Sequence, residues 1–166
     1  MATPTGELVP TTDGLDLVIT RSLGLPIEQV WARLTDPDLT AGWYGTWTGE
    51  PGTGNTIRVQ MRFEDGAPWT AMHIDDCAPP LHLGLSATDQ IGLWRLEVSL
   101  LDTGAATEVR LVHHLTSEFQ LAEVTQVGPG WEYYADMFVA ACTNTSLPDF
   151  ADYYPAMAEY YRQRAA

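Results

Sequence analysis

The sequence is poor in cysteine and in basic residues, and both shortages exclude classes of function. Cys77 and Cys142 are its two cysteines, and their separation matches neither a zinc knuckle nor a redox pair. Eight Lys and Arg residues stand against 22 Asp and Glu residues, so the formal net charge is −14. Nucleic acids and anionic membranes bind clustered basic side chains, so we expect neither as a partner. The acidity either favours solubility or offers a docking face to a protein partner with a basic surface.

Long apolar segments are also absent from the sequence. The longest wholly apolar run, residues 137–142, is far shorter than the roughly 20 residues needed to span a bilayer. The first residues lack the charged and then apolar regions of a secretory signal peptide. These features predict a cytoplasmic protein whose thiols are free.

Sequence motifs of cofactor and nucleophile sites are incomplete. Gly52 and Gly54 would need a third glycine at the position of Ile57 to form a dinucleotide fingerprint. Residues 84–88 lack the second glycine of a hydrolase nucleophile elbow. Neither cysteine has an adjacent histidine that would activate it. We therefore predict no cofactor and find no catalytic constellation, which favours a function other than catalysis.

The four histidines are not spaced as metal ligands. His113 and His114 are neighbours on a predicted strand, so their side chains point to opposite faces and cannot chelate one ion. His73 and His82 lie on other predicted strands with no carboxylate at ligand spacing, so we predict no metal site. His113 shares its face with apolar residues and is expected to point inward. There it is either a core histidine bonded to a tyrosine or carbonyl, or a polar handle for a ligand.

Alternation of apolar and polar residues is the commonest pattern in the chain and predicts half-buried strands. Five segments show it: residues 15–20, 57–63, 81–87, 93–101 and 107–115. Trp69–Asp75 is a further predicted strand of ambiguous facing, because Met72 and Ile74 compete with Trp69 for the inner side. Breaks at Pro79-Pro80, residues 89–92 and residues 102–104 leave short connections, which indicate antiparallel pairing.

Helical periodicity marks two segments. Residues 26–36 begin with Pro26, carry an apolar stripe and end at Asp36-Pro37, and residues 38–41 add one further turn. Residues 123–144 form a longer helix with Pro129 in its first turn. Its apolar face is spaced in steps of three and four residues: Val127, Trp131, Tyr134, Phe138 and Ala141.

The chain is long enough for one domain with a sizeable core. Residues 1–13 are polar and without periodicity, which predicts a loose N-terminal tail. Residues 14–144 are expected to form the domain. Residues 145–166 are expected to form a C-terminal extension, in which a short Tyr-rich helix starting near Pro155 packs on the outside of the domain.

The order of elements is that of an α+β protein: strand, early helix pair, antiparallel strands, long helix. Several short pieces, spread over residues 15–142, resemble the helix-grip fold of the START-like and birch-pollen-allergen superfamily, SRPBCC. Within it they resemble the AHSA-type branch, named for activators of the heat-shock-protein-90 ATPase. The pieces are Ile27–Trp31 with Thr35–Pro37, Leu39 with Trp43-Tyr44, Pro79-Pro80 with Leu81, Thr107–His113 and Gly130-Trp131.

The resemblance implies a curved antiparallel sheet of about six to seven strands wrapped around the long C-terminal helix. It also implies a cavity between sheet and helix that commonly takes an apolar small molecule. The residues predicted to line this cavity are Trp43, Met61, Trp94, Leu111, His113, Trp131, Tyr134 and Phe138. Taken singly, a residue of this kind is more often plain core, but as a set they are richer in Trp and Tyr than a tight core requires.

Three functions fit these observations. The leading hypothesis is binding of a hydrophobic or aromatic small molecule, for sequestration or transport, with His113 and Tyr134 supplying orienting hydrogen bonds. The second is a polyketide cyclase-like enzyme that would use the same two groups for proton transfer. The third is a chaperone co-factor or protein-interaction module that would use the acidic surface and the Tyr-rich C-terminal helix.

Overall fold

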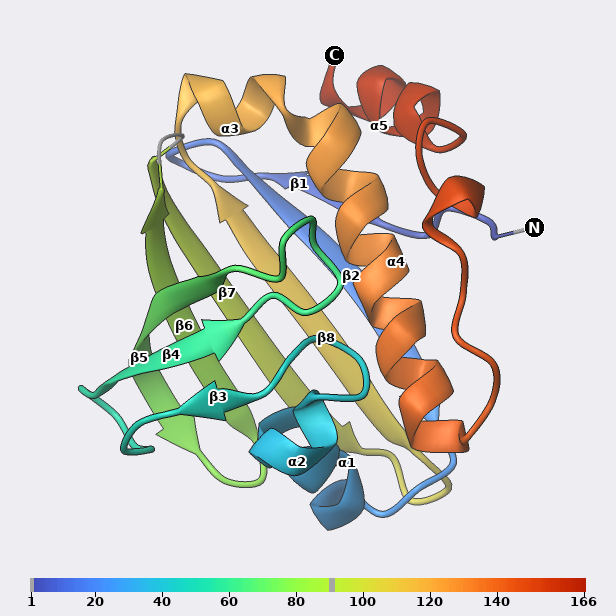
Figure 1. Ribbon diagram of the computed structural model, residues 1–166. Helices are drawn as coiled ribbons and strands as arrows, with labels where there is room; N and C mark the ends of the chain where they lie inside the picture. The colour runs from blue at the N-terminus through green and yellow to red at the C-terminus, as the bar shows by residue number, and fades with distance from the viewer. Residues whose placement is uncertain (1, 90–91) are drawn as a thin grey trace.

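The strands of the protein form one curved antiparallel sheet. A computed structural model describes residues 2–89 and 92–166, apart from the side chain of Phe119. Eight strands lie side by side in the order β1-β2-β8-β7-β6-β5-β4-β3 (Figure 1). Their bounds are β1 Glu7–Pro10, β2 Leu15–Leu23, β3 Trp47–Thr48, β4 Thr56–Gln60, β5 Trp69–Ala78, β6 His82–Asp89, β7 Gly92–Asp102 and β8 Thr107–Leu115.

The long helix α4, Val124–Thr143, lies across the concave face of this sheet (Figure 1). The other helices are α1 Ile27–Thr35, α2 Pro37–Thr40, α3 Glu118–Ala122, the 3-10 turn η1 Phe150–Asp152 and α5 Ala158–Ala165. Figure 1 shows α1 and α2 together at one end of the sheet and α5 beside the start of α4. The predicted helix-grip architecture is therefore confirmed. Within the described residues, no helix combines the length and the apolar character that a membrane crossing requires.

Strands β1 and β3 were not predicted, and one predicted strand is shorter than expected. Residues 7–10, which we expected in a loose tail, pair as β1 with β2. The strand predicted over residues 57–63 ends at Gln60, and the Met61 amide instead donates to the Pro68 carbonyl. The apolar and polar residues keep alternating to Phe63, so the sequence pattern does not indicate where β4 ends and the loop to β5 begins. The predicted break at residues 89–92 includes residues 90–91, which lie outside the described residues.

Burial settles which side of each strand faces α4. Met72 and Ile74 of β5 are buried, whereas the side chain of Trp69 is exposed, so the ambiguous strand presents Met72 and Ile74 to the interior. The same alternation buries Leu96 and Leu100 of β7. Because side chains on a strand alternate between faces, the intervening residues form the outer, solvent-facing side of the sheet.

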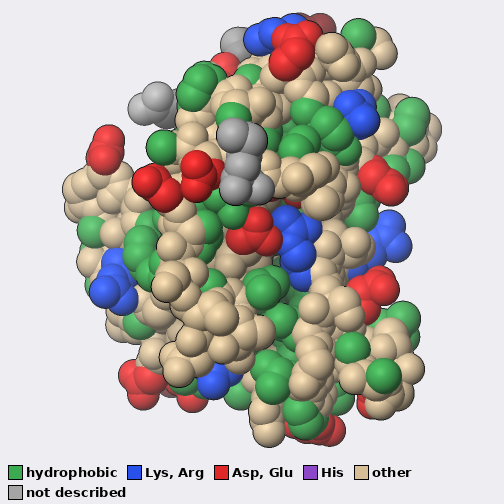
Figure 2. Space-filling model, turned by 90° about the vertical axis from the view of Figure 1, so that its right-hand side faces the viewer, with side chains coloured by type: hydrophobic (Ala, Val, Ile, Leu, Met, Phe, Trp, Pro, Cys, Tyr) green, Lys and Arg blue, Asp and Glu red, His purple; other side chains and the backbone are tan. Residues whose placement is uncertain are grey.

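Helix α4 is packed on two sides. A Cβ atom on Gly128 would lie 2.6 Å from the ring of Tyr161 in α5, so only glycine allows this close approach. Pro129 lies in the second turn and not in the first, because the helix begins at Val124. Figure 2 looks onto this side of the molecule, where apolar side chains lie between scattered acidic and basic ones. The C-terminal extension therefore covers the face of α4 that the sheet does not.

Candidate ligand-binding cavity

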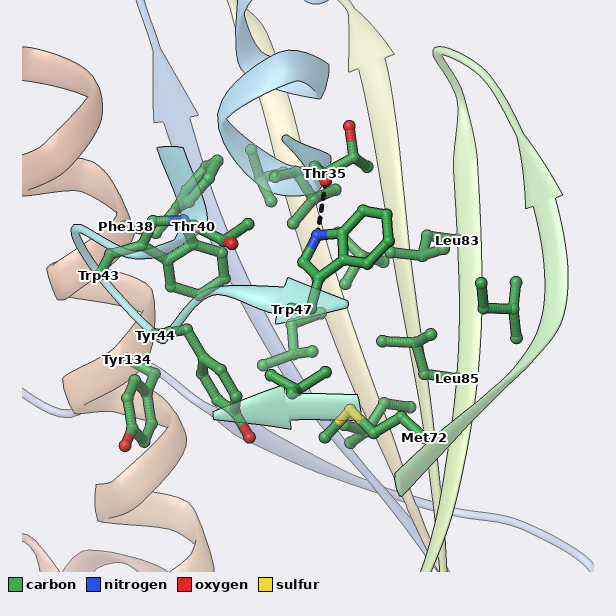
Figure 3. Close-up of a pocket in the computed structure, with 18 of the residues that line it drawn as sticks. Thr35, Thr40, Trp43, Tyr44, Trp47, Met72, Leu83, Leu85, Tyr134 and Phe138 are labelled. Atoms are coloured by element: carbon green, nitrogen blue, oxygen red, sulfur yellow. Dashed lines mark hydrogen bonds between the residues drawn. The ribbon is translucent and has the colours of Figure 1, made fainter. Parts of the chain in front are cut away.

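A cavity of about 180 Å³ lies between the concave face of the sheet and α4 (Figure 3). Strands β4 and β5 contribute Ile57, Val59 and Met72 to its wall, and β6 contributes Leu83 and Leu85. These residues share the inward-facing side of their strands, so the curvature of the sheet turns one continuous apolar surface toward the helix. The wall is therefore almost entirely hydrocarbon and aromatic.

The segment 41–46, between α2 and β3, carries aromatic side chains over one end of the cavity. It approaches β4 closely at Gly45, where a Cβ atom would lie only 1.6 Å from the Gln60 carbonyl oxygen. The Gln60 amide in turn donates to the Thr46 carbonyl at 2.9 Å. A glycine is required at position 45, because any side chain would push the aromatic segment off the sheet.

Aromatic rings from this segment meet rings from α4. Trp43 packs edge-on against Phe138, with ring centroids 4.9 Å apart, and Tyr44 lies 4.9 Å from Tyr134 in a tilted pair. Figure 3 shows these four rings on one side of the cavity and Met72 and Leu85 across from them. The pairs join the aromatic segment to α4 and close this side of the cavity.

The indole N–H groups of Trp43, in the segment 41–46, and of Trp47, in β3, already donate hydrogen bonds within the protein. Nε1 of Trp43 donates to the Arg33 carbonyl at 2.9 Å, and Nε1 of Trp47 donates to the Thr35 carbonyl at 2.8 Å. Figure 3 shows the second of these bonds. Because the N–H edges point to the end of α1, the two indoles turn their apolar surfaces to the cavity.

The phenol of Tyr134, on the cavity wall, is bonded to an exposed carboxylate outside the wall. The hydroxyl of Tyr134 donates to Oε2 of Glu64 at 2.8 Å. Burial, then this hydrogen bond and the charge of Glu64, raise the pKa of Tyr134, and burial and Glu64 also raise the pKa of Tyr44. Both phenols therefore stay protonated at neutral pH and act as hydrogen-bond donors rather than as bases.

His113 lies behind the cavity wall and not on it. Its side chain is fully buried, its ring stacks on Trp94 with centroids 4.6 Å apart, and its Nδ1 accepts a hydrogen bond from Nε1 of Trp131 at 3.1 Å. Burial, and then the nearby charge of His114, lower the pKa of His113 to about 4. His113 is therefore neutral at pH 7 and holds the indole of Trp131 in place.

The structure brings five of the eight predicted residues to the cavity wall: Trp43, Leu111, Trp131, Tyr134 and Phe138. It does not bring Met61, Trp94 or His113 there. Met61 follows the end of β4, and the other two lie on inward-facing positions beyond the end of the cavity. The wall stops at Leu96 on β7 and at Leu111 on β8, one inward position before Trp94 and His113 respectively.

Tyr44 and Trp47 line the cavity although sequence reasoning did not select them. The available signal was the run of three aromatics among glycines at residues 42–47. Choosing among those aromatics needs the path of the loop, which depends on the contact between Gly45 and β4.

Two histidines on the outer face of the sheet have carboxylate partners on adjacent strands. His114 lies between Asp16 and Glu97, at 2.7 and 2.5 Å, and His82 lies between Asp76 and Glu97, at 2.6 and 3.1 Å. His82 thus has carboxylate partners on the strands to either side of it, because strand pairing adds neighbours that sequence spacing does not reveal. Within residues 2–89 and 92–166, no three such side chains are placed to hold a metal ion.

Comparison with known proteins places the chain in a family. The sequence profile described as "Activator of Hsp90 ATPase homolog 1-like protein" matches residues 24–143. No curated protein matches the chain.

Solved structures share the fold over most of the chain. CalU16 from Micromonospora echinospora is 20% identical, with a TM-score of 0.76, over 98% of this chain and 97% of that one. A protein from Bordetella parapertussis is 22% identical, with a TM-score of 0.72, over 99% and 93%. DynU16, described as a protein in the dynemicin biosynthetic locus, is 22% identical, with a TM-score of 0.69, over 81% of this chain and 50% of its own.

Proposed function

Because the chain belongs to the Activator of Hsp90 ATPase homolog 1-like family, we propose that it binds a hydrophobic or aromatic small molecule between the sheet and α4. The observation that carries this proposal is the apolar cavity of about 180 Å³. A dry cavity of about 150 Å³ lined by Leu, Ile and Phe is large enough to bind benzene. The cavity in this protein therefore has room for a ligand of one or two rings.

The chemistry of the wall supports binding more than catalysis. An acid–base mechanism needs a group that takes up or releases a proton near the working pH. Burial and Glu64 hold Tyr44 and Tyr134 protonated, and the neutral His113 lies behind Trp131. In the described part of the chain, the groups on the cavity wall thus offer contact area and hydrogen bonds, which suit a carrier or a sequestering protein.

A biosynthetic setting for one structural neighbour is in keeping with a small-molecule ligand. DynU16 is described as belonging to the dynemicin biosynthetic locus. At 22% identity this likeness is evidence for a shared fold only, so the ligand of this protein has to be inferred from the side chains of its own cavity.

Native mass spectrometry of freshly purified protein, beside the same sample denatured, is the first test. A mass excess that is lost on denaturation identifies a non-covalent ligand, and extraction gives its class. Ligand-observed NMR with 1-tetralone, a neutral bicyclic ketone, then tests the site directly. Saturable binding of this probe supports the proposal.

A matched pair of substitutions assigns the binding to the cavity. Ala135→Leu fills space at the α4 wall, whereas Ala71→Leu adds the same atoms at an exposed position of β5. We expect the first variant to lose probe binding and the second to keep it, with both chains folded by circular dichroism. Equal binding by the two variants would contradict the proposed site.

A further inference from the structure

The polar side chains on the cavity wall are nearly all engaged by other groups. The two indoles donate to carbonyls at the end of α1, and the hydroxyls of Thr35 and Thr40 donate to the carbonyls of Trp31 and Pro37 at 2.8 and 3.3 Å. A hydrogen bond already made inside the protein is not available to a ligand without a cost in free energy. The choice of ligand therefore depends on the few groups that remain unengaged.

Arg21 is the charged residue of the wall, and its charge is already neutralised. Its Nε donates to Asp136 at 2.8 Å, its Nη2 lies 3.5 Å from Glu132, and its Nη1 donates to the Thr5 hydroxyl at 2.9 Å. Glu132 is fully buried, so moving Arg21 to a ligand would leave an uncompensated buried carboxylate. Among the described residues, the wall thus offers no free cation to an anionic ligand.

Tyr44 carries the strong donor that remains. In the part of the chain that the structure describes, its hydroxyl has no hydrogen-bond partner, whereas the neighbouring Tyr134 hydroxyl is held by Glu64. Figure 3 shows the ring of Tyr44 on the cavity wall, between Tyr134 and Met72. The thiol of Cys77 also lines the wall, but thiols are weak donors.

The carboxylate of Glu64 gives this end of the cavity a negative charge. Its Oε2 accepts the hydrogen bond from Tyr134, whose ring lies 4.9 Å from the ring of Tyr44, and after burial it is the next cause that raises the pKa of both phenols. The same charge disfavours a carboxylate or phosphate placed next to Tyr44, and because Glu64 itself is exposed, water and salt screen part of this repulsion.

From these observations we infer that the ligand is an uncharged ring compound with one hydrogen-bond acceptor, such as a ketone or quinone carbonyl, which accepts from the Tyr44 hydroxyl. The inference rests on the proposed function and adds the chemical class of the ligand and its orientation. The rings occupy the apolar space toward Leu85 and Phe138, and the acceptor points to the Tyr44 end of the cavity. Tyr44 is thus a specificity-determining residue.

Three probes with one bicyclic skeleton test the inference. Tetralin has no acceptor, 1-tetralone has a neutral acceptor, and 1,2,3,4-tetrahydronaphthalene-1-carboxylate has a charged one. We expect 1-tetralone to bind most tightly and the carboxylate most weakly. One buried hydrogen bond corresponds to about a 2- to 10-fold difference in dissociation constant between 1-tetralone and tetralin.

Two substitutions separate the roles of Tyr44 and Glu64. Tyr44→Phe removes the donor and should weaken 1-tetralone binding by about 2- to 10-fold while leaving tetralin unchanged. Glu64→Gln removes the negative charge and should tighten binding of the carboxylate. Glu28→Gln is the matched control, since Glu28 is an exposed residue on α1 and its loss changes the net charge equally.

The outcomes distinguish the inference from the proposed function beneath it. If tetralin binds as tightly as 1-tetralone, or if Tyr44→Phe weakens both equally, the cavity binds ligands but the inference is wrong. If Glu64→Gln and Glu28→Gln act alike on the carboxylate, the charge of Glu64 does not select against anions, and the preference for an uncharged ligand is wrong. If none of the three probes binds, both the proposed function and the inference that rests on it are wrong.

Discussion

His113 and His114 are adjacent on β8, yet they face opposite sides of the sheet and have opposite chemistry. His113 is fully buried, stacks on Trp94 and accepts from Trp131, and its pKa is lowered to about 4 by burial. Burial also lowers the pKa of His114, but its hydrogen bonds to Glu97 and Asp16 outweigh that effect, and the net shift is upward. The side of the sheet, and not the residue type, decides whether the imidazole carries a charge.

The same contrast holds for the two faces as a whole. The inner face presents apolar side chains to a cavity, and most of its polar atoms are already bonded. On the outer face, Asp16, His114, Glu97, His82 and Asp76 form a chain of hydrogen bonds across five neighbouring strands. His114 has a carboxylate on each ring nitrogen, which requires two N–H donors and favours its protonated form. The proposed ligand selectivity lies on the inner face, whereas the outer face carries the histidine that is favoured in its charged form.

The largest effect that separates the two faces is expected from adjacent leucines on β7. Leu100 is 4% exposed in a packed cluster with Val30 and Phe138, whereas Leu101 is 59% exposed. Leu100→Ala should lower the free energy of unfolding by about 2–5 kcal/mol, because it leaves a cavity in the core. Leu101→Ala should change it by less than about 0.5 kcal/mol. Urea denaturation measures both, and similar losses would contradict the assignment of the faces.

Acid should destabilise the protein through His113. The folded pKa of about 4 lies below the ordinary value of 6.5, so the unfolded chain binds more protons between these values. The contribution of neutral His113 to the free energy of unfolding is fully present above pH 6.5. It is lost as the pH drops toward 4, by roughly 3 kcal/mol in total. His113→Phe should flatten that slope in denaturation measured from pH 7 to pH 4.

His114→Gln is the control for this experiment, and it should keep the acid-dependent loss. The folded pKa of His114 is raised, so the stabilisation it gives is present below 6.5 and is lost as the pH rises through its folded pKa. A flattened slope in the His114 variant, with the full slope kept in the His113 variant, would mean that the two faces have been assigned the wrong way round.

The smallest effect is expected from Glu97→Gln on the outer face. Glu97 contacts both His82 and His114, but its side chain is 43% exposed, so the stability change should stay below about 1 kcal/mol. The pKa of His114 should nevertheless fall toward its ordinary value, because a neutral amide stabilises the imidazolium less than a carboxylate does. An NMR titration of the His114 ring protons measures this shift, and an unchanged pKa would show that Glu97 is not its main partner.

Periodicity was sufficient to predict much of the fold. The alternation over β2, β6, β7 and β8 and the spacing of Trp131, Tyr134 and Phe138 each reflect a face that must be buried, and burial is a requirement on the sequence itself. Strand β1 was missed because its pairing with β2 depends on backbone hydrogen bonds, which leave no periodic signal in four residues. The Thr5 contacts with buried Glu132 likewise join residues far apart in the sequence.

The cavity wall could be predicted only where a residue is both inward-facing and central along its strand. Leu111 meets both conditions, whereas His113 faces inward but lies past the end of the cavity. Tyr44 was not selected, because its place on the wall follows from a loop that passes over β4 at Gly45. Position along a strand and the path of a loop are properties of the assembled fold, and local pattern does not encode them.

The sequence by itself determined the α+β class, the inward faces of most strands, the apolar face of α4 and the absence of a nucleophile motif. These follow from which side chains avoid water and from which short motifs are present. Only the tertiary structure decided where the cavity begins and ends, that the Trp43 and Trp47 N–H groups are engaged, and that the Tyr44 hydroxyl has no hydrogen-bond partner among the described residues. The physical reason is that hydrogen-bond satisfaction depends on which backbone carbonyls and carboxylates chain folding brings within about 3 Å.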